Sequence, residues 1–175
     1  LSEVPKAIGC AVVPWNPEIR NERWHWDVDF LRDNVNKATK LIIVTSPHNP
    51  TGHLFTKKEY KEIMDIAKEN GCYVFSDEMY RFLEHDPKDR LPSGAALYEK
   101  CISLFGMSKT FGLGGLRLGW LSVREPELLG RIIAFKDYTS LCNNALSEYI
   151  AFIVLRKKNT IISRNLGIIK RNLKL

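Results

Sequence analysis

Three short apolar segments recur along the chain, and polar or helix-like stretches separate them. They cover residues 41–45, 73–76 and 101–105. Apolar runs of this length that alternate with helical segments are typical of parallel strands joined by crossovers. The pattern predicts an α/β fold with a mostly parallel sheet. A further strand-like run is Gly9-Cys10-Ala11-Val12-Val13, and the polar stretch 84–93 reads as a surface loop.

The stretch between the first two runs has the pattern of an amphipathic helix. Thr56-Lys57-Lys58-Glu59 has the form of a capping box, which marks a helix start, and Asn70-Gly71 marks a stop. Further helices are expected from Pro126 to about Tyr138 and over 144–156. The expected buried stripe of the first helix consists of Tyr60, Ile63, Met64 and Ala67.

Polar residues follow the three apolar runs where each run ends. Asn49, Asp77 and Lys109 occupy these positions. In open α/β sheets, ligands bind outside the carboxyl ends of the strands, so parallel neighbours would bring the three residues to one edge. Between Lys109 and Arg117 there are too few residues for a parallel crossover. The run 117–123 should therefore return antiparallel and give a mixed sheet.

The segment from Phe105 to Gly119 carries the strongest chemical signal. It places Lys109 after a strand-like run, then a glycine-rich loop, then Arg117 eight positions on. An amine that forms an imine needs close backbone approach, which glycine permits, and a nearby arginine can bind an anionic group of the same ligand. Two more motifs precede it: Ser46-Pro47-His48-Asn49-Pro50-Thr51-Gly52 and Val74-Phe75-Ser76-Asp77-Glu78-Met79-Tyr80.

Together, these three motifs resemble those of the class I/II, fold-type I (aspartate-aminotransferase-like) enzymes that depend on pyridoxal 5'-phosphate. The resemblance covers essentially the whole chain and implies part of that family's large domain, a mixed sheet with helices on both faces. It implies a Schiff-base lysine that also shuttles a proton (Lys109), a partner for the pyridine nitrogen (Asp77), partners for the ring's phenolic oxygen (Tyr80 and Asn49) and phosphate ligands (Arg117 and Ser108). Many relatives have a hydroxyl residue where Gly106 stands, so one usual phosphate contact is missing from this sequence.

The function that the resemblance implies is transamination between an amino acid and a 2-oxo acid, with a homodimer in the full-length protein. The same motifs serve β-lyases, decarboxylases and cyclases. A non-catalytic or truncated remnant of such an enzyme is a further alternative, because relatives have an upstream phosphate-binding turn and a downstream small domain. We expect residues 1–158 to be part of the cofactor-binding domain and 159–175 to be a helix leading toward a small domain.

The charge of +6 is concentrated at the carboxyl end, where residues 156–175 hold basic and no acidic side chains. Apolar positions at helical spacing make this end an amphipathic helix with a solvated basic face. The same segment contains no aromatic residue that could stack on bases, which makes nucleic-acid binding the weaker interpretation.

The four cysteines are widely spaced, so neither a metal site nor a disulfide framework is expected. The first residues lack the form of a signal peptide, and no apolar stretch is long enough to cross a membrane. These features predict a cytoplasmic location.

Overall fold

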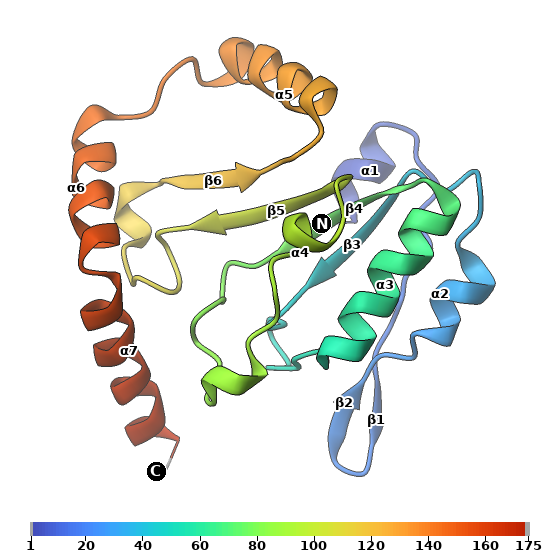
Figure 1. The fold of residues 1–175 in the computed structure, drawn as a ribbon, viewed down its shortest axis with the longest axis horizontal. Coiled ribbons are helices and arrows are strands. Elements are labelled where there is room, and N and C mark those ends of the chain that lie inside the picture. Colours follow the sequence, from blue (N-terminus) through green and yellow to red (C-terminus); the bar gives the residue numbers. More distant parts are fainter. Residues whose placement is uncertain (1, 174–175) are drawn as a thin grey trace.

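A computed structural model describes residues 2–173 of the chain. Its centre is a four-stranded sheet in the order β3-β4-β5-β6 (Figure 1). The strands are β3 (Leu41–Thr45), β4 (Tyr73–Asp77), β5 (Cys101–Gly106) and β6 (Gly119–Ser122). β3, β4 and β5 are parallel, and β6 returns antiparallel to β5. The predicted α/β fold, its mixed sheet and the antiparallel return are confirmed.

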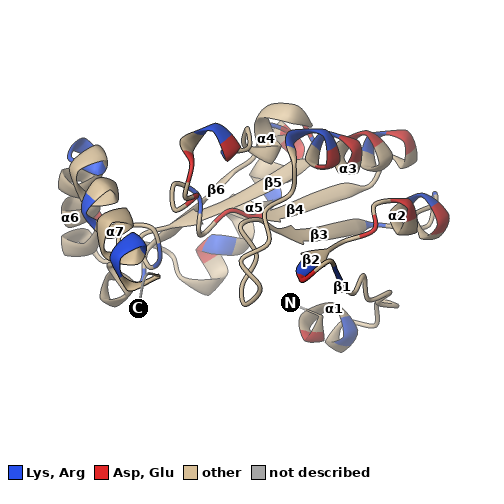
Figure 2. Ribbon diagram, turned by 90° about the horizontal axis from the view of Figure 1, so that it is seen from below, with Lys and Arg blue, Asp and Glu red and all other residues tan. Residues whose placement is uncertain are grey.

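Helices lie beside this sheet. They are α1 (Glu3–Ala7), α2 (Asp29–Asn34), α3 (Lys57–Asn70), α4 (Gly94–Leu97), α5 (Pro126–Thr139), α6 (Ala145–Arg156) and α7 (Lys158–Asn172), with 3-10 turns at Pro87–Asp89 and Gly114–Leu116. α3 and α4 lie on one side of the sheet and the short α1 on the other (Figure 2). The helices predicted after Thr56, from Pro126 and over 144–156 correspond to α3, α5 and α6.

Helix α3 shows how local sequence sets an element of the fold. The Thr56 side chain accepts a hydrogen bond from the Glu59 amide at 3.2 Å, and the Glu59 carboxylate accepts one from the Thr56 amide at 2.7 Å. The helix ends at Gly71, whose φ of 72° is left-handed and suits glycine. The predicted stripe is buried, together with Ile66.

The main core lies between α3 and the parallel strands. Ile63, Ala67, Val74 and Cys101 have 0% exposed surface. These side chains come from α3, β4 and β5. The core therefore fixes the two strands that end just before Tyr80 and Lys109.

A second, smaller core joins the segment after β5 to the last two helices. Met107 and Phe111 pack in one cluster with Ala151, Val154 and Ile162. The helical segment predicted over 159–175 is observed as α7, which begins at Lys158; residues 174 and 175, like residue 1, lie outside the described residues. The division into two domain portions remains a prediction.

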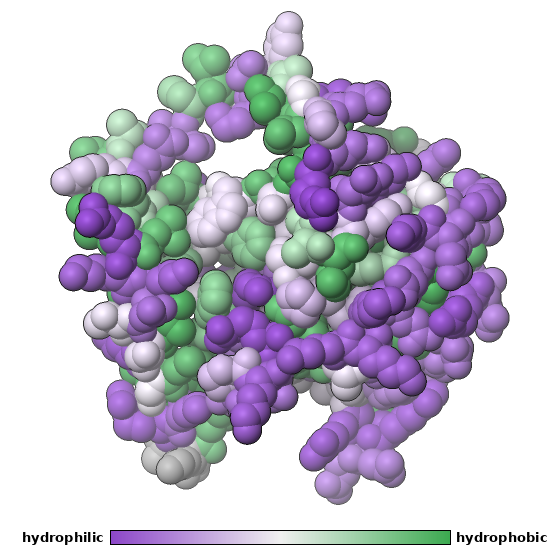
Figure 3. All heavy atoms as spheres, viewed as in Figure 1, coloured by the Kyte–Doolittle hydropathy of each residue, from purple (hydrophilic) through white to green (hydrophobic). Residues whose placement is uncertain are grey.

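Helices α5 and α6 expose much apolar surface. Helix α5 has no buried residue, and Phe135 is 71% exposed and Tyr138 94% exposed. On α6, Tyr149 is 65% exposed. Hydrophobic atoms gather over both helices in the space-filling view (Figure 3).

Two expectations about local structure are wrong. Residues 9–13 form no strand, because no neighbouring strand of the described chain pairs with them. The stretch 84–93 is not simply a surface loop, since Glu84 and Leu91 are buried. A separate hairpin, formed by β1 (Glu18–Arg20) and β2 (Arg23–His25), was not predicted from the sequence.

Within residues 2–173, the structure contains no helix with the length and apolar character needed to cross a bilayer.

Candidate active site

The candidate residues follow strand ends that lie at one edge of the sheet. Thr45 of β3 pairs with Asp77 of β4, and Asp77 pairs with Leu104 of β5. Asn49, Tyr80 and Lys109 come a few residues after these pairs. Parallel strands point the same way, so all three segments leave the sheet at its carboxyl edge.

The antiparallel strand brings Arg117 back to that edge. Gly106 of β5 pairs with Gly119 of β6, and the Met107 amide donates to the Leu118 carbonyl at 3.0 Å. The segment that contains Lys109 and Arg117 is therefore the loop of a hairpin.

Tyr80 contacts residues of both neighbouring loops. The Asn49 Nδ2 donates to the Tyr80 hydroxyl at 3.2 Å. The Lys109 Nζ lies 5.9 Å from the centroid of the Tyr80 ring, a distance at which an ammonium is attracted to an aromatic face. An amide, a phenol and an amine thus meet from the segments after β3, β4 and β5.

Asp77 is the last residue of β4 and is half-buried. Its Oδ1 accepts a hydrogen bond from the Met79 amide at 3.1 Å. A short aspartate side chain that bonds its own backbone two residues on stabilises a turn. This turn directs the chain from the strand end toward Tyr80.

The loop after β5 presents an amine and a guanidinium at its surface. Lys109 and Arg117 are exposed, and Ser108 is half-buried. The Gly112 amide donates to the Lys109 carbonyl at 3.1 Å, and the φ of 69° at Gly112 is left-handed. The Arg117 Nη1 donates to the Gly114 carbonyl at 3.1 Å, which folds the guanidinium over the glycine loop.

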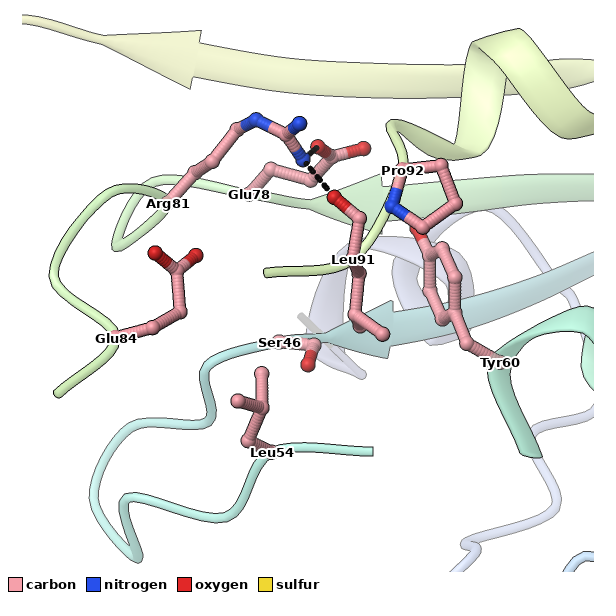
Figure 4. A pocket seen from close by; sticks show the side chains of 8 residues that line it. All are labelled: Ser46, Leu54, Tyr60, Glu78, Arg81, Glu84, Leu91 and Pro92. Atoms are coloured by element: carbon pink, nitrogen blue, oxygen red, sulfur yellow. Dashed lines mark hydrogen bonds and ion pairs between the residues drawn. The ribbon is translucent and has the colours of Figure 1, made fainter. Parts of the chain in front are cut away.

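Two ion pairs, each with a buried glutamate and a partly exposed arginine, hold the segment that carries Tyr80. Glu78 is 4% exposed, and its Oε2 accepts a hydrogen bond from the Arg81 Nη1 at 3.1 Å. That same nitrogen donates to the Leu91 carbonyl at 2.8 Å (Figure 4). Glu84 is paired with Arg90 at 3.1 Å. Because a buried carboxylate is costly without a partner, these pairs restrict the backbone around Tyr80.

A polar cavity of about 10 Å³ lies beside these groups (Figure 4). Ser46 and Tyr60 contribute to its wall, and the Tyr60 hydroxyl shares a hydrogen bond of 2.6 Å with Ser76. Burial, and then the nearby Glu78 carboxylate, raise the pKa of the Tyr60 phenol, which therefore stays protonated. Glu78 and Arg81, which lie on either side of Tyr80 in the chain, also line this cavity.

Sequence reasoning missed two residues at this edge. Thr110 bonds to the backbone on both sides of Tyr80, and Asn165 of α7 bonds to the backbone of Thr110. The position of Thr110 directly after Lys109 was the available signal. For Asn165 there was none, because its contact lies 55 residues away in the chain.

The side chains at this edge fit an anionic, aldehyde-bearing aromatic cofactor. An amine can bond to the aldehyde, a carboxylate can pair with a ring nitrogen, and a phenol and an amide can donate to a ring oxygen. Arginine and serine can bind a phosphate. The assignment of these tasks to the individual residues remains a prediction.

Comparison with known proteins supplies an independent observation. The model of the family "Aminotransferase class I and II" matches residues 2–166. A probable aspartate aminotransferase of Methanocaldococcus jannaschii is 32% identical over 141 residues, which are 78% of this chain and 37% of that protein. An aromatic-amino-acid aminotransferase of Thermococcus litoralis is 32% identical over 146 residues, 82% of this chain and 37% of that protein.

Solved structures give the same picture for the fold. The crystal structure of a pyridoxal-phosphate-dependent aminotransferase from Streptococcus suis superposes with a TM-score of 0.89 at 31% identity. The match covers 98% of this chain and 44% of that one. The chain thus spans roughly two fifths of the length of the proteins it matches.

Proposed function

The chain belongs to the class I and II aminotransferase family, and we propose that it is part of a pyridoxal-phosphate-dependent aminotransferase. Its substrates are an amino acid and a 2-oxo acid. The observation that carries the proposal is the meeting of Asn49, Tyr80 and Lys109 at the carboxyl edge of the sheet.

The residues at this edge divide into those that hold the cofactor ring and those that hold its phosphate. Lys109 would hold the cofactor as the Schiff-base lysine, Asp77 would pair with the ring nitrogen, and Asn49 and Tyr80 would bond to the ring oxygen. Ser108 and Arg117 would bind the phosphate. The cofactor, when bound, supplies an electron sink for the bond that breaks at the substrate's α-carbon.

The protein's own contribution is to place groups and to move one proton. Once the amine of the substrate has displaced it from the cofactor, the free Lys109 amine would take the proton from the α-carbon of the amino acid and would give it back later in the transfer of the amino group. Tyr80 lies next to this amine, and Asn49 holds the Tyr80 hydroxyl. Asn49 and Tyr80 both follow strand ends, so the sheet fixes their positions. The Lys109 amine is therefore held in a defined position relative to Tyr80, which favours proton transfer.

The substrate class follows from the family. The two relatives described above are named for aspartate and for aromatic amino acids. An amino acid paired with a 2-oxo acid is common to both names. Asn49 is the residue of this chain that we place beside the substrate carboxylate.

We also propose a cytoplasmic location and a homodimer in the full-length protein. Free thiols at all four cysteines suit a reducing compartment. The exposed apolar side chains of α5 and α6, such as Phe135 and Tyr149, support a further contact surface.

Covalent trapping tests the cofactor assignment. The 175-residue chain, and any longer protein that contains it, would be incubated with pyridoxal 5'-phosphate, reduced with borohydride and mapped by peptide mass spectrometry. We expect the adduct on Lys109, and its loss in Lys109→Arg. The control is Lys57→Arg, an exposed lysine at the start of α3. An adduct that stays on another lysine with Lys109 unmodified would show the assignment to be wrong.

Activity is tested separately with a panel of amino acids and 2-oxo acids. The longer protein should transfer the amino group, and Lys109→Arg should lower the rate by at least about 10³-fold, because general base catalysis and the covalent link are both removed. The 175-residue chain alone should turn over little. A chain with ordinary enzymatic rates in isolation would refute that expectation.

A further inference from the structure

Thr110 connects the lysine loop to the tyrosine loop. It directly follows Lys109 and is 3% exposed. Its hydroxyl lies 2.6 Å from the Arg81 carbonyl and 3.1 Å from the Met79 carbonyl. These two carbonyls belong to the residues on either side of Tyr80. Thr110, the residue next to Lys109, is therefore hydrogen-bonded to the backbone that positions Tyr80.

Helix α7 fixes Thr110 from a second direction. The Asn165 Nδ2 donates to the Thr110 carbonyl at 2.9 Å. The surrounding packing is apolar, since Met107 and Phe111 belong to one buried cluster with Ile162 of the same helix. Residue 110 is thus held through its side chain on one side and its main chain on the other.

The tyrosine loop has a backbone conformation that such a bond would stabilise. Phe82 has a φ of 75°, in the left-handed region that a bulky side chain rarely adopts. The peptide before Phe82 contains the Arg81 carbonyl, to which Thr110 makes its shorter hydrogen bond. The guanidinium groups of Arg81 and Arg90 also lie over the Phe82 ring, at 5.4 and 4.6 Å from its centroid.

We propose that Thr110 and Asn165 are positioning residues, which together set the spacing between the Lys109 amine and Tyr80. This proposal rests on the function proposed above, since the spacing matters for a cofactor held by both side chains. Thr110 sets the tyrosine loop against the lysine loop. Asn165 sets the lysine loop against α7.

Hydrogen exchange in the cofactor-free chain tests the positioning itself. The informative amides are those of Arg81 and Leu83 in the tyrosine loop, and those of Gly112 and Leu113 in the lysine loop, all of which are hydrogen-bonded. In Thr110→Val, the exchange of Arg81 and Leu83 should become about tenfold faster, which is the effect of losing one buried hydrogen bond. In Asn165→Leu, the exchange of Gly112 and Leu113 should rise several-fold.

Two control variants separate positioning from general destabilisation. Thr110→Ser keeps the hydroxyl and should restore the slow exchange. Asn159→Leu makes the same chemical change as Asn165→Leu at an exposed position of α7 and should leave both loops unchanged. If Thr110→Val does not fold, Asn165→Leu and its control decide the question alone.

Cofactor affinity links the positioning to the site. Titration with pyridoxal 5'-phosphate, followed by absorbance, should give an affinity about tenfold weaker in Thr110→Val and close to the original in Thr110→Ser. Unchanged exchange in the folded variants, or faster exchange with unchanged cofactor affinity, would overturn the proposal. If a longer protein that contains the unsubstituted chain binds no cofactor, the proposed function fails, while the exchange rates still decide whether the two residues position the loops.

Discussion

Two regions of this chain contain helices of equal length with opposite surroundings. Helix α3 and helix α5 each have 14 residues, but α3 buries a full apolar stripe and α5 buries none. The region around α3 includes β3, β4, β5 and α4, and we call it the closed region. The region of β6, α5 and α6 is the open region. Asn49, Asp77 and Tyr80 lie at or just after the ends of strands of the closed region. The segment around Lys109 also follows such a strand, but it packs against α6 and α7.

In the open region, helices form although few of their residues are buried. Its helices form from local sequence, as Pro126 and the Asn144 cap show, although little packing covers them. Apolar side chains exposed over two consecutive helices are characteristic of a contact surface. A helix can therefore form in this chain without being buried. Matched substitutions in the two regions can measure how much burial adds to the free energy of unfolding.

The largest expected difference comes from removing the same side chain in both regions. Ile63→Ala on α3 should lower the free energy of unfolding by about 3 kcal/mol, because the site has 0% exposure and the cavity left behind cannot collapse fully. Ile133→Ala on α5, where the side chain is 52% exposed, should change it by less than about 0.5 kcal/mol. Urea denaturation followed by circular dichroism measures both. Equal losses would contradict the distinction between the regions.

A glycine in each region gives a second matched pair. A Cβ added to Gly94 would lie 2.5 Å from the Cys101 Sγ and 2.8 Å from the Tyr60 hydroxyl. Gly94→Ala should therefore cost about 2 kcal/mol through overpacking. A Cβ on Gly130 of α5 meets nothing within 4 Å. Gly130→Ala should stabilise the helix by about 0.5–1 kcal/mol, the ordinary propensity gain. Thermal unfolding of the two variants should shift in opposite directions.

The N-terminal caps of α3 and α6 also differ in how much they should contribute to the stability of the whole chain. Thr56→Ala removes the hydrogen bond to the Glu59 amide, and the free energy of unfolding should fall by about 1 kcal/mol. Asn144→Ala removes the equivalent bond to the Ser147 amide at the start of α6. We expect that change to appear mainly as several-fold faster hydrogen exchange in the first turn of α6. A global loss of equal size would mean that α6 folds together with the main core.

The smallest expected effect is the change in the free energy of unfolding at acidic pH. All four histidines lie between residues 25 and 85, outside the open region. Burial among the Trp26 and Phe55 rings lowers the pKa of His53, and burial lowers that of His48. The unfolded chain then binds more protons below a pH of about 6.5, so the free energy of unfolding should fall as the pH drops through that value.

The matched variants for this test are His53→Phe and His85→Gln. The dependence on pH should become shallower in His53→Phe, which keeps an aromatic ring in the cluster, and stay the same in His85→Gln, which changes an exposed residue. The measurement is urea denaturation at several values of pH between 5 and 8. A slope that is unaltered in His53→Phe would refute the role given to its burial.

Sequence patterns predicted the elements whose signals are local. The three apolar runs became β3, β4 and β5, and the capping box opened α3, because each pattern is complete within a few residues. The run at 9–13 has the same kind of pattern but no partner strand among the described residues, and a strand exists only when it is paired.

The placement of candidate residues at strand ends was predictable for the same local reason, whereas their support was not. Glu84 lies in a polar stretch that read as solvent-exposed, yet it is buried against Arg90. Asn165 reaches Thr110 across 55 residues of sequence. Such polar contacts depend on how two segments that are far apart in the sequence pack together. Neither motif spacing nor composition predicts which distant residues will meet.

The hairpin of β5 and β6 has a consequence for the order of folding. Gly106 and Gly119 pair across 13 residues, whereas Thr45 and Asp77 pair across 32. Closing a shorter loop costs less entropy, and contacts between near neighbours in the chain form faster than distant ones. The lysine and the arginine of the glycine loop can therefore approach each other before the parallel strands have assembled. The two ends of the proposed cofactor site would then form at different times. The phosphate-binding end around Arg117 would form first, and the ring-binding end with Asn49, Asp77 and Tyr80 would form last.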